Sequence, residues 1–90
     1  MSCNRTIEKN VNEELFFEEI EKTKKCLAKV LNIDVKNIIE VADEDVFATI
    51  DSREKTFCKR KIYNFEQGSI DCYMSKDLKF IEIFCHPNTE

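Results

Sequence analysis

Few side chains in this sequence combine the residue types and the spacing that bond-making chemistry requires. The single histidine, His86, directly follows Cys85, and a cysteine nucleophile needs an imidazole within hydrogen-bonding reach. Neighbouring residues on a strand point to opposite faces, so these two side chains are badly placed to meet. His86 could still approach Cys58 or Cys72 in space, which leaves a cysteine-dependent enzyme as a second alternative. The sequence favours a protein that is not an enzyme.

Metal and cofactor sites also lack their usual patterns. A structural zinc site commonly uses two close pairs of cysteines, but the cysteines stand at positions 3, 26, 58, 72 and 85. The acidic run 43–45 has no neighbouring glycine, which a calcium loop needs for its sharp turn. We therefore predict no metal and no cofactor. The odd number and even scatter of the cysteines predict free thiols in place of a disulfide framework.

The composition bounds the class of protein. A chain of 90 residues is long enough for one hydrophobic core but too short for two, so we predict a single domain over 1–90. With 42% hydrophobic and 36% charged residues, it should fold, and it contains no apolar run of the roughly 20 residues that span a membrane. Residues 1–10 are polar and lack the apolar block of a signal peptide, which predicts a cytoplasmic protein. Abundant Ile, Lys and Asn indicate a low-GC genome.

A long helix is the clearest element that the sequence predicts. Apolar residues recur every three or four positions over residues 11–31, the spacing of an amphipathic helix. Asn10 followed by Glu13 resembles a capping box, and Asn32 is a suitable stop because asparagine tolerates the left-handed conformation. Residues 1–10 are expected to be flexible or to extend the helix, and residues 86–90 to form a flexible tail.

After the helix the apolar pattern changes to a period of two, which predicts strands. The acidic run 43–45 is expected to form a turn, Gly68 a tight hairpin, and Pro87 the end of the last strand. Asp34 could instead cap a short helix through Ile39, leaving four strands. The predicted strands are Ile38–Ala42, Val46–Asp51, Thr56–Phe65, Ile70–Met74 and Leu78–Cys85. The fold class is therefore α+β, with one long N-terminal helix packed on a four- or five-stranded antiparallel sheet.

Two acidic stretches are the strongest candidates for a function. The first lies in the N-terminal half of the helix, whose other half is basic; complementation of the helix dipole explains this order, and a recognition surface is the alternative. The second begins after the helix and contains no base. Together they could occupy a basic groove in a larger protein, in the manner of a nucleic-acid mimic. The acidic candidates are Glu13, Glu14, Glu18, Glu21, Glu40, Asp43, Glu44 and Asp45.

Surplus aromatic residues indicate a second recognition surface. On the last strand, Phe80 and Phe84 alternate with apolar neighbours, so one helix should not cover both faces of the sheet. An exposed aromatic face would suit a homodimer or a docking partner. The aromatic candidates are Phe17, Tyr73, Phe80 and Phe84.

A basic and aromatic stretch supplies the main alternative function. Bases interleaved with aromatic rings on a sheet are used by domains that bind single-stranded nucleic acid. The residues concerned are Lys55, Phe57, Lys59, Arg60, Lys61 and Tyr63. A net charge of -4 disfavours direct contact with nucleic acid. We therefore expect a small acidic protein-binding module that acts stoichiometrically, comparable in composition to phage- or mobile-element-encoded inhibitors of nucleic-acid-handling proteins.

Overall fold

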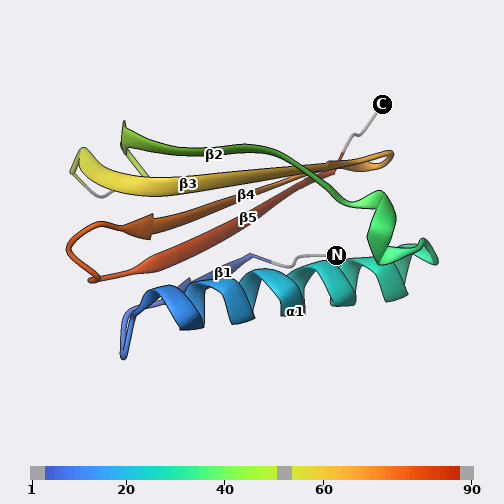
Figure 1. Cartoon of the computed structure of the whole chain (residues 1–90), viewed down its shortest axis with the longest axis horizontal. Coiled ribbons are helices and arrows are strands. Elements are labelled where there is room, and N and C mark those ends of the chain that lie inside the picture. Colours follow the sequence, from blue (N-terminus) through green and yellow to red (C-terminus); the bar gives the residue numbers. More distant parts are fainter. Residues whose placement is uncertain (1–3, 51–53, 88–90) are drawn as a thin grey trace.

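The protein has the α+β architecture predicted from its sequence (Figure 1). The structure, a computed structural model, describes residues 4–50 and 54–87. Its elements are β1 (Arg5–Ile7), α1 (Glu13–Leu31), the 3₁₀ helix η1 (Val35–Asn37), β2 (Ile39–Ala48), β3 (Thr56–Phe65), β4 (Gly68–Ser75) and β5 (Ile81–Pro87). The strands form one five-stranded antiparallel sheet in the order β1-β5-β4-β3-β2. The long strand β2 and the short strand β1 are therefore its two edges.

Helix α1 begins two residues later than predicted and ends where predicted. Asn12, rather than Asn10, is the N-cap, because its side chain accepts a 2.8 Å hydrogen bond from the backbone N–H of Leu15. Asn10 lies in the turn before the helix and has a φ of 56°. At the other end, Asn32 has a φ of 55° and its backbone N–H bonds to carbonyls of the last turn, as expected of a left-handed cap.

The N-terminal segment corrects one prediction. Residues 5–7 are neither flexible nor helical but form strand β1, which pairs with β5 in the register Arg5↔Ile83. Two side-chain contacts add to the backbone pairing: Arg5 Nη1 lies 2.6 Å from Glu19 Oε1 on the helix, and Thr6 Oγ1 donates to Glu82 Oε2 over 2.8 Å. Contacts with residues distant in sequence, on α1 and β5, therefore stabilise this short strand.

Strand β2 corrects a second prediction. The acidic run 43–45 is not a turn but the middle of one strand of ten residues, so the two short strands predicted before and after it are a single element. Opposite-charge pairs with the neighbouring strand β3 stabilise this acidic run in extended form. Asp34 does cap a short helix, but η1 ends at Asn37 and β2 follows directly. The C-terminal end of the second predicted strand, at Asp51, lies outside the described residues.

The remaining strands follow the predictions closely. Strand β3 has the predicted bounds, and a two-residue turn joins it to β4, where Gly68 has the positive φ of 153° that favours glycine. Strand β5 begins at Ile81 rather than Leu78, because Leu78 has a φ of 60° in the preceding turn. It ends at Pro87, two residues beyond the predicted bound at Cys85. His86 therefore belongs to the strand and not to a tail, and residues 88–90 lie outside the described part.

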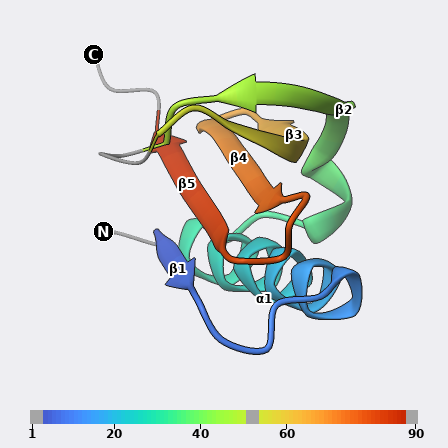
Figure 2. The same cartoon turned by 90° about the vertical axis from the view of Figure 1, so that its left-hand side faces the viewer.

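The core lies on both faces of the sheet. The main cluster fills the space between α1 and the sheet, with Phe16, Ile20 and Leu27 of the helix buried against Ile81 and Ile83 of β5. A smaller cluster on the opposite face contains Ile50, Cys58 and Phe80. Figure 2 shows the helix on one side of the sheet, beside β1 and β5, with β2 far from it. The helix therefore leaves most of β2 uncovered, whereas Tyr63 of β3 is buried in the main cluster on the helix side.

The cysteines agree with the predicted free thiols only in part. Cys26, Cys58 and Cys72 are free, but Cys85 is disulfide-bonded. That prediction is wrong at Cys85, because spacing along a chain does not show which distant segments β-pairing brings together. Cys3 lies outside the described residues.

Candidate functional site

The acidic stretch on β2 and the basic stretch on β3 lie side by side and neutralise each other. The antiparallel register places Asp43 opposite Lys61, Glu44 opposite Arg60 and Asp45 opposite Lys59. Opposite charges facing one another across two strands stabilise the pairing by roughly 0.2–1 kcal/mol each. We call this set of cross-strand charges the charge ladder. Two features that the sequence offered as separate recognition surfaces are thus largely one structural device.

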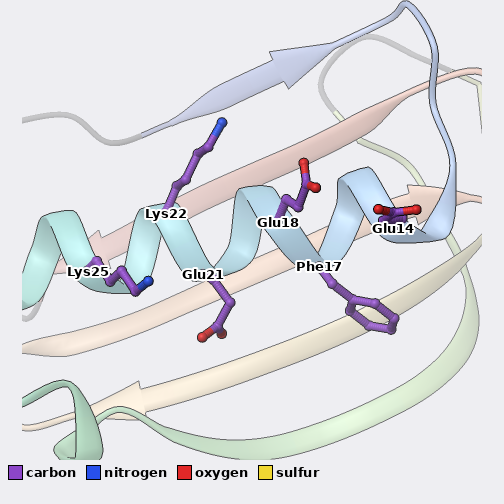
Figure 3. Close-up of a pocket in the computed structure, with 6 residues that line it drawn as sticks. All are labelled: Glu14, Phe17, Glu18, Glu21, Lys22 and Lys25. Carbon is purple, nitrogen blue, oxygen red and sulfur yellow. The ribbon is translucent and has the colours of Figure 1, made fainter.

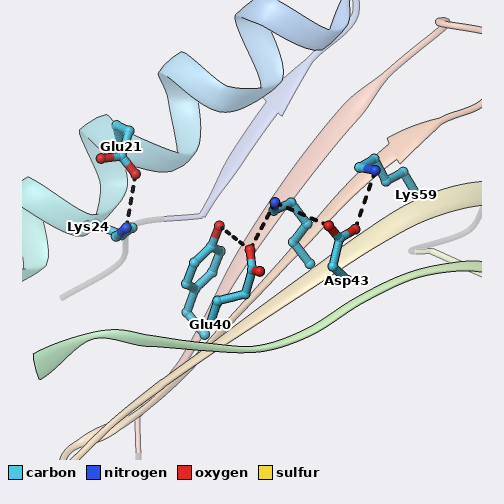
Figure 4. Close-up of polar contacts among 7 residues, drawn as sticks. Glu21, Lys24, Glu40, Asp43 and Lys59 are labelled. Carbon is cyan, nitrogen blue, oxygen red and sulfur yellow. Dashed lines mark hydrogen bonds and ion pairs between the residues drawn. The ribbon is translucent and has the colours of Figure 1, made fainter. Parts of the chain in front are cut away.

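On the face toward the helix, the ladder residues Asp43, Lys59 and Lys61 form a connected network with Glu40 and Tyr63 (Figure 4). Lys61 Nζ lies 2.9 Å from Glu40 Oε1 and 3.5 Å from Asp43 Oδ2, and Lys59 Nζ lies 3.3 Å from Asp43 Oδ1. The Tyr63 hydroxyl donates to Glu40 over 3.1 Å. The hydrogen bond from Lys61 lowers the pKa of Glu40, which shows that the network favours its ionised form.

The other members of the charge ladder are also paired. Arg60 bonds to Glu44 on the opposite face of the sheet, and this hydrogen bond raises the pKa of Arg60. Asp45 lies 3.1 Å from Lys76, in the turn after β4. Every acidic candidate on β2 therefore has a basic partner within the chain, which reduces its use for an external one.

The same pairing weakens the nucleic-acid alternative. Of its six candidates, Lys59, Arg60 and Lys61 are held by carboxylates, and Tyr63 is buried. Lys55 remains exposed, and Phe57 is 40% exposed with Lys76 Nζ 5.9 Å from its ring centre. The structure does not gather these six residues into one free basic surface.

The acids of helix α1 behave differently. Glu13, Glu14 and Glu18 are exposed, and among the described residues none of them has an ion-pair partner. Glu21 pairs with Lys24 over 3.0 Å. Beside them Phe17 is 40% exposed, with Lys61 Nζ 5.1 Å from its ring centre. We call these five residues, Glu13, Glu14, Phe17, Glu18 and Glu21, the acidic helix face.

Figure 3 shows how the acidic helix face is arranged. Glu18 and Lys22 point to one side of the helix, while Phe17 and Glu21 point to the other, toward β3 and β2. A shallow surface hollow lies along this stripe, and it is lined by Glu14, Phe17, Glu18, Glu21, Lys22 and Lys25. The stripe is acidic over its first half and basic over its second.

Glu19 is a buried acid that the sequence did not identify as a candidate. It is 5% exposed and binds both Arg5, at 2.6 Å, and Lys22, at 3.2 Å. Glu19 lies in sequence between the core residues Phe16 and Ile20, so the helical spacing of apolar residues could have placed it on the inward side of the helix. Glu19 fastens β1 to the helix, so its role is structural.

The aromatic candidates divide into buried and accessible residues. Phe80 is 5% exposed because Ile50, after β2, packs against it on the face away from the helix. The expectation that Phe80 is exposed for an interface is therefore wrong, since the chain itself covers part of that face. Tyr73 and Phe84 border the same cluster and remain half-buried. Phe47 was missed: it is 65% exposed and its ring centre lies 4.8 Å from that of Phe57.

In the part of the chain that the structure describes, His86 and the buried thiols Cys58 and Cys72 are not arranged as a nucleophile and its base. Burial raises the pKa of Cys72 to about 12, and burial, helped by the charge of Asp77, raises the pKa of Cys58. A reactive cysteine needs a lowered pKa. His86 instead contacts Asp71, with 3.2 Å between Nε2 and Oδ2. Within residues 4–50 and 54–87, no group of three or more potential ligands is placed to hold a metal ion.

No helix in the described ranges is long and apolar enough to cross a membrane. A comparison with known proteins finds no matching family model, no matching curated protein and no matching solved structure.

Proposed function

We propose that this protein is a small, acidic, cytoplasmic binding module that acts stoichiometrically on a larger protein. The observation that carries the proposal is the contrast between its two acidic stretches: the acids of β2 are paired within the chain, whereas Glu13, Glu14 and Glu18 have no ion-pair partner among the described residues. Carboxylates that form no ion pair within the described part of the chain are available for recognition.

The chemistry of the acidic helix face suits a basic groove. Negative charge on a rigid helix speeds the encounter with a positively charged surface. Phe17, exposed among these carboxylates, supplies an aromatic anchor of the kind that dominates interface energetics. The preferred partner is therefore a nucleic-acid-handling protein, whose groove normally receives phosphates.

The mechanism would be occlusion of that groove, without turnover. The buried thiols Cys58 and Cys72, with their raised pKa values, supply no ready nucleophile, which agrees with a non-enzymatic role. The low-GC composition and small size fit an inhibitor encoded by a phage or mobile element and directed against a host defence protein.

Affinity capture with matched variants tests the proposal. The immobilised protein should capture a defined larger protein from a bacterial lysate, and the reconstituted complex should have a fixed stoichiometry. The double variant Glu14→Lys/Glu18→Lys should lose at least tenfold in affinity by calorimetry, a change of about 1.4 kcal/mol. Its matched control, Glu54→Lys/Asp77→Lys, has the same change in net charge at two exposed acids that are not part of the helix and should bind normally.

Two results would contradict the proposal. Equal losses in both double variants would show that only net charge matters, and not the acidic helix face. A shift of single-stranded DNA or RNA at low salt, abolished by Lys59→Glu/Lys61→Glu and not by the helix variant, would support the nucleic-acid alternative instead.

A further inference from the structure

A second hollow lies on the face of the sheet turned away from the helix. The segment that follows β2 crosses this face, where Ile50 is 4% exposed and packs with Cys58 and Phe80. Beside it the surface is hollowed. The hollow is lined by Thr49, Ile50, Asp71, Tyr73, Phe84 and His86, and we call it the aromatic hollow.

Three rings form one wall of the aromatic hollow. The Tyr73 and Phe84 rings meet edge to face, with 6.1 Å between their centres and 70° between their planes. Phe84 and His86 follow with 6.3 Å between centres and a tilt of 31°. Tyr73 and Phe84 are half-buried, so their positions are fixed by packing while part of each ring stays open to a ligand.

One carboxylate lies among these rings. Asp71, on β4 between Cys72 and Ile70, has a side chain that is 25% exposed, and its Oδ2 contacts His86 Nε2 over 3.2 Å. Among the described residues it has no other hydrogen-bond or ion-pair partner. One of its two oxygens is therefore free to accept a further hydrogen bond.

The surrounding charges leave the aromatic hollow suited to a cation. Arg60, a permanent cation on this face, is opposite Tyr73 in the strand register, and its guanidinium hydrogen-bonds to Glu44 and to the Tyr73 side chain. Its positive charge is thus offset within the chain. A carboxylate framed by aromatic rings is the environment that a flat guanidinium prefers, because it stacks on rings and gives two parallel hydrogen bonds to a carboxylate.

We propose that the aromatic hollow binds the guanidinium of an arginine side chain, with Asp71 as hydrogen-bond acceptor and Phe84 and Tyr73 as the stacking wall. The inference rests on the proposed function for its source of arginine, since the side chain would come from the bound partner protein. Binding of a small arginine derivative, however, is a property of the hollow alone. Arginine is also the residue most often found as a hot spot in protein interfaces, together with tryptophan and tyrosine.

Titration of the ¹⁵N-labelled protein with N-acetyl-arginine amide tests the inference by NMR. Millimolar ligand should shift the amide signals of residues 49–50, 71–73 and 84–86 together. N-acetyl-citrulline amide, which has the same shape without the charge, should leave them unmoved. Asp71→Asn should weaken the arginine derivative about tenfold, equivalent to about 1.4 kcal/mol, while the control Asp77→Asn, in the turn after β4, should bind as the wild type does.

Further variants keep the test decisive. Phe84→Leu should weaken binding while keeping an apolar side chain in the cluster, so a folded protein with unchanged affinity would overturn the stacking role. Equal shifts with the citrulline derivative, or larger shifts with adenosine monophosphate at the same residues, would overturn the assignment to guanidinium. Glu14→Lys/Glu18→Lys should still bind the arginine derivative. The experiments therefore distinguish failure of the arginine-binding inference from failure of the proposed function of the acidic helix face.

Discussion

Reversing the three bases at the centre of β3 tests whether the charge ladder holds β2 to the sheet. In Lys59→Glu/Arg60→Glu/Lys61→Glu, three attractive cross-strand pairs become three repulsive ones. The acids of these pairs, Asp43, Glu44 and Asp45, are 41–46% exposed at the side chain, so water screens each pair. Each change from attraction to repulsion should therefore cost about 1 kcal/mol, or about 3 kcal/mol in total.

Urea unfolding followed by circular dichroism measures this loss directly. For a domain of this size, about 3 kcal/mol corresponds to a drop in Tm of roughly 15 °C. Exchanging the two sides of the ladder, by adding Asp43→Lys, Glu44→Arg and Asp45→Lys to the triple variant, should recover more than half of the lost stability. Recovery stays incomplete because Glu40 and Lys76 then face like charges.

The ladder reasoning fails under two outcomes. A triple variant within about 0.5 kcal/mol of the wild type, the usual range for an unimportant surface change, would show that the pairs contribute nothing. A sixfold variant no more stable than the triple variant would show that the bases matter for another reason. High salt should also narrow the difference between wild type and triple variant, since exposed charges are screened.

Three further predictions follow from single contacts. Arg5→Met should destabilise the fold by about 1–2 kcal/mol in urea, because it removes a partner of the buried Glu19 carboxylate; an unchanged unfolding midpoint would contradict this. Thiol labelling of the native protein near neutral pH should modify the exposed Cys26 and spare Cys72, whose pKa burial raises to about 12; fast loss of the Cys72 thiol would reopen a cysteine mechanism. Burial raises the pKa of Asp43, but hydrogen bonds and charges from Lys59 and Lys61 outweigh burial and lower the pKa overall. The ionised Asp43 carboxylate therefore stabilises the fold above about pH 4, and this stabilisation is lost as the pH falls through the lowered pKa. Asp43→Asn should therefore lower stability at pH 6 and converge with the wild type in acid, and parallel curves across that range would refute the assignment.

The elements that the sequence predicted well are those whose signal is local. The helix has a clear apolar period over its length and asparagines at its ends, and β3 is rich in aromatic and apolar residues on either side of its three central bases. Strand β1 has three residues, too few to show an apolar period. It forms because it pairs with β5 and because Arg5 binds Glu19. The acidic run 43–45 resembled a turn because its partners lie on another strand, fourteen to eighteen positions along the chain. Register between strands is a long-range property, so neither the charge ladder nor the mutual neutralisation of the two charged stretches was visible beforehand.

The acids of the helix separate the structural from the functional use of charge. The helix dipole acts within the first turn, so it accounts for Glu13 and Glu14, which stand there, but not for Glu18, one turn further on. Glu13→Gln should thus cost about 0.3–1 kcal/mol of stability, whereas Glu18→Gln should leave stability unchanged and weaken partner capture. If Glu18→Gln lowered stability and spared capture, the exposed carboxylates would serve the fold alone. On the helix, the surface that folding leaves unexplained is then narrowed to Glu18 and the exposed ring of Phe17 beside it.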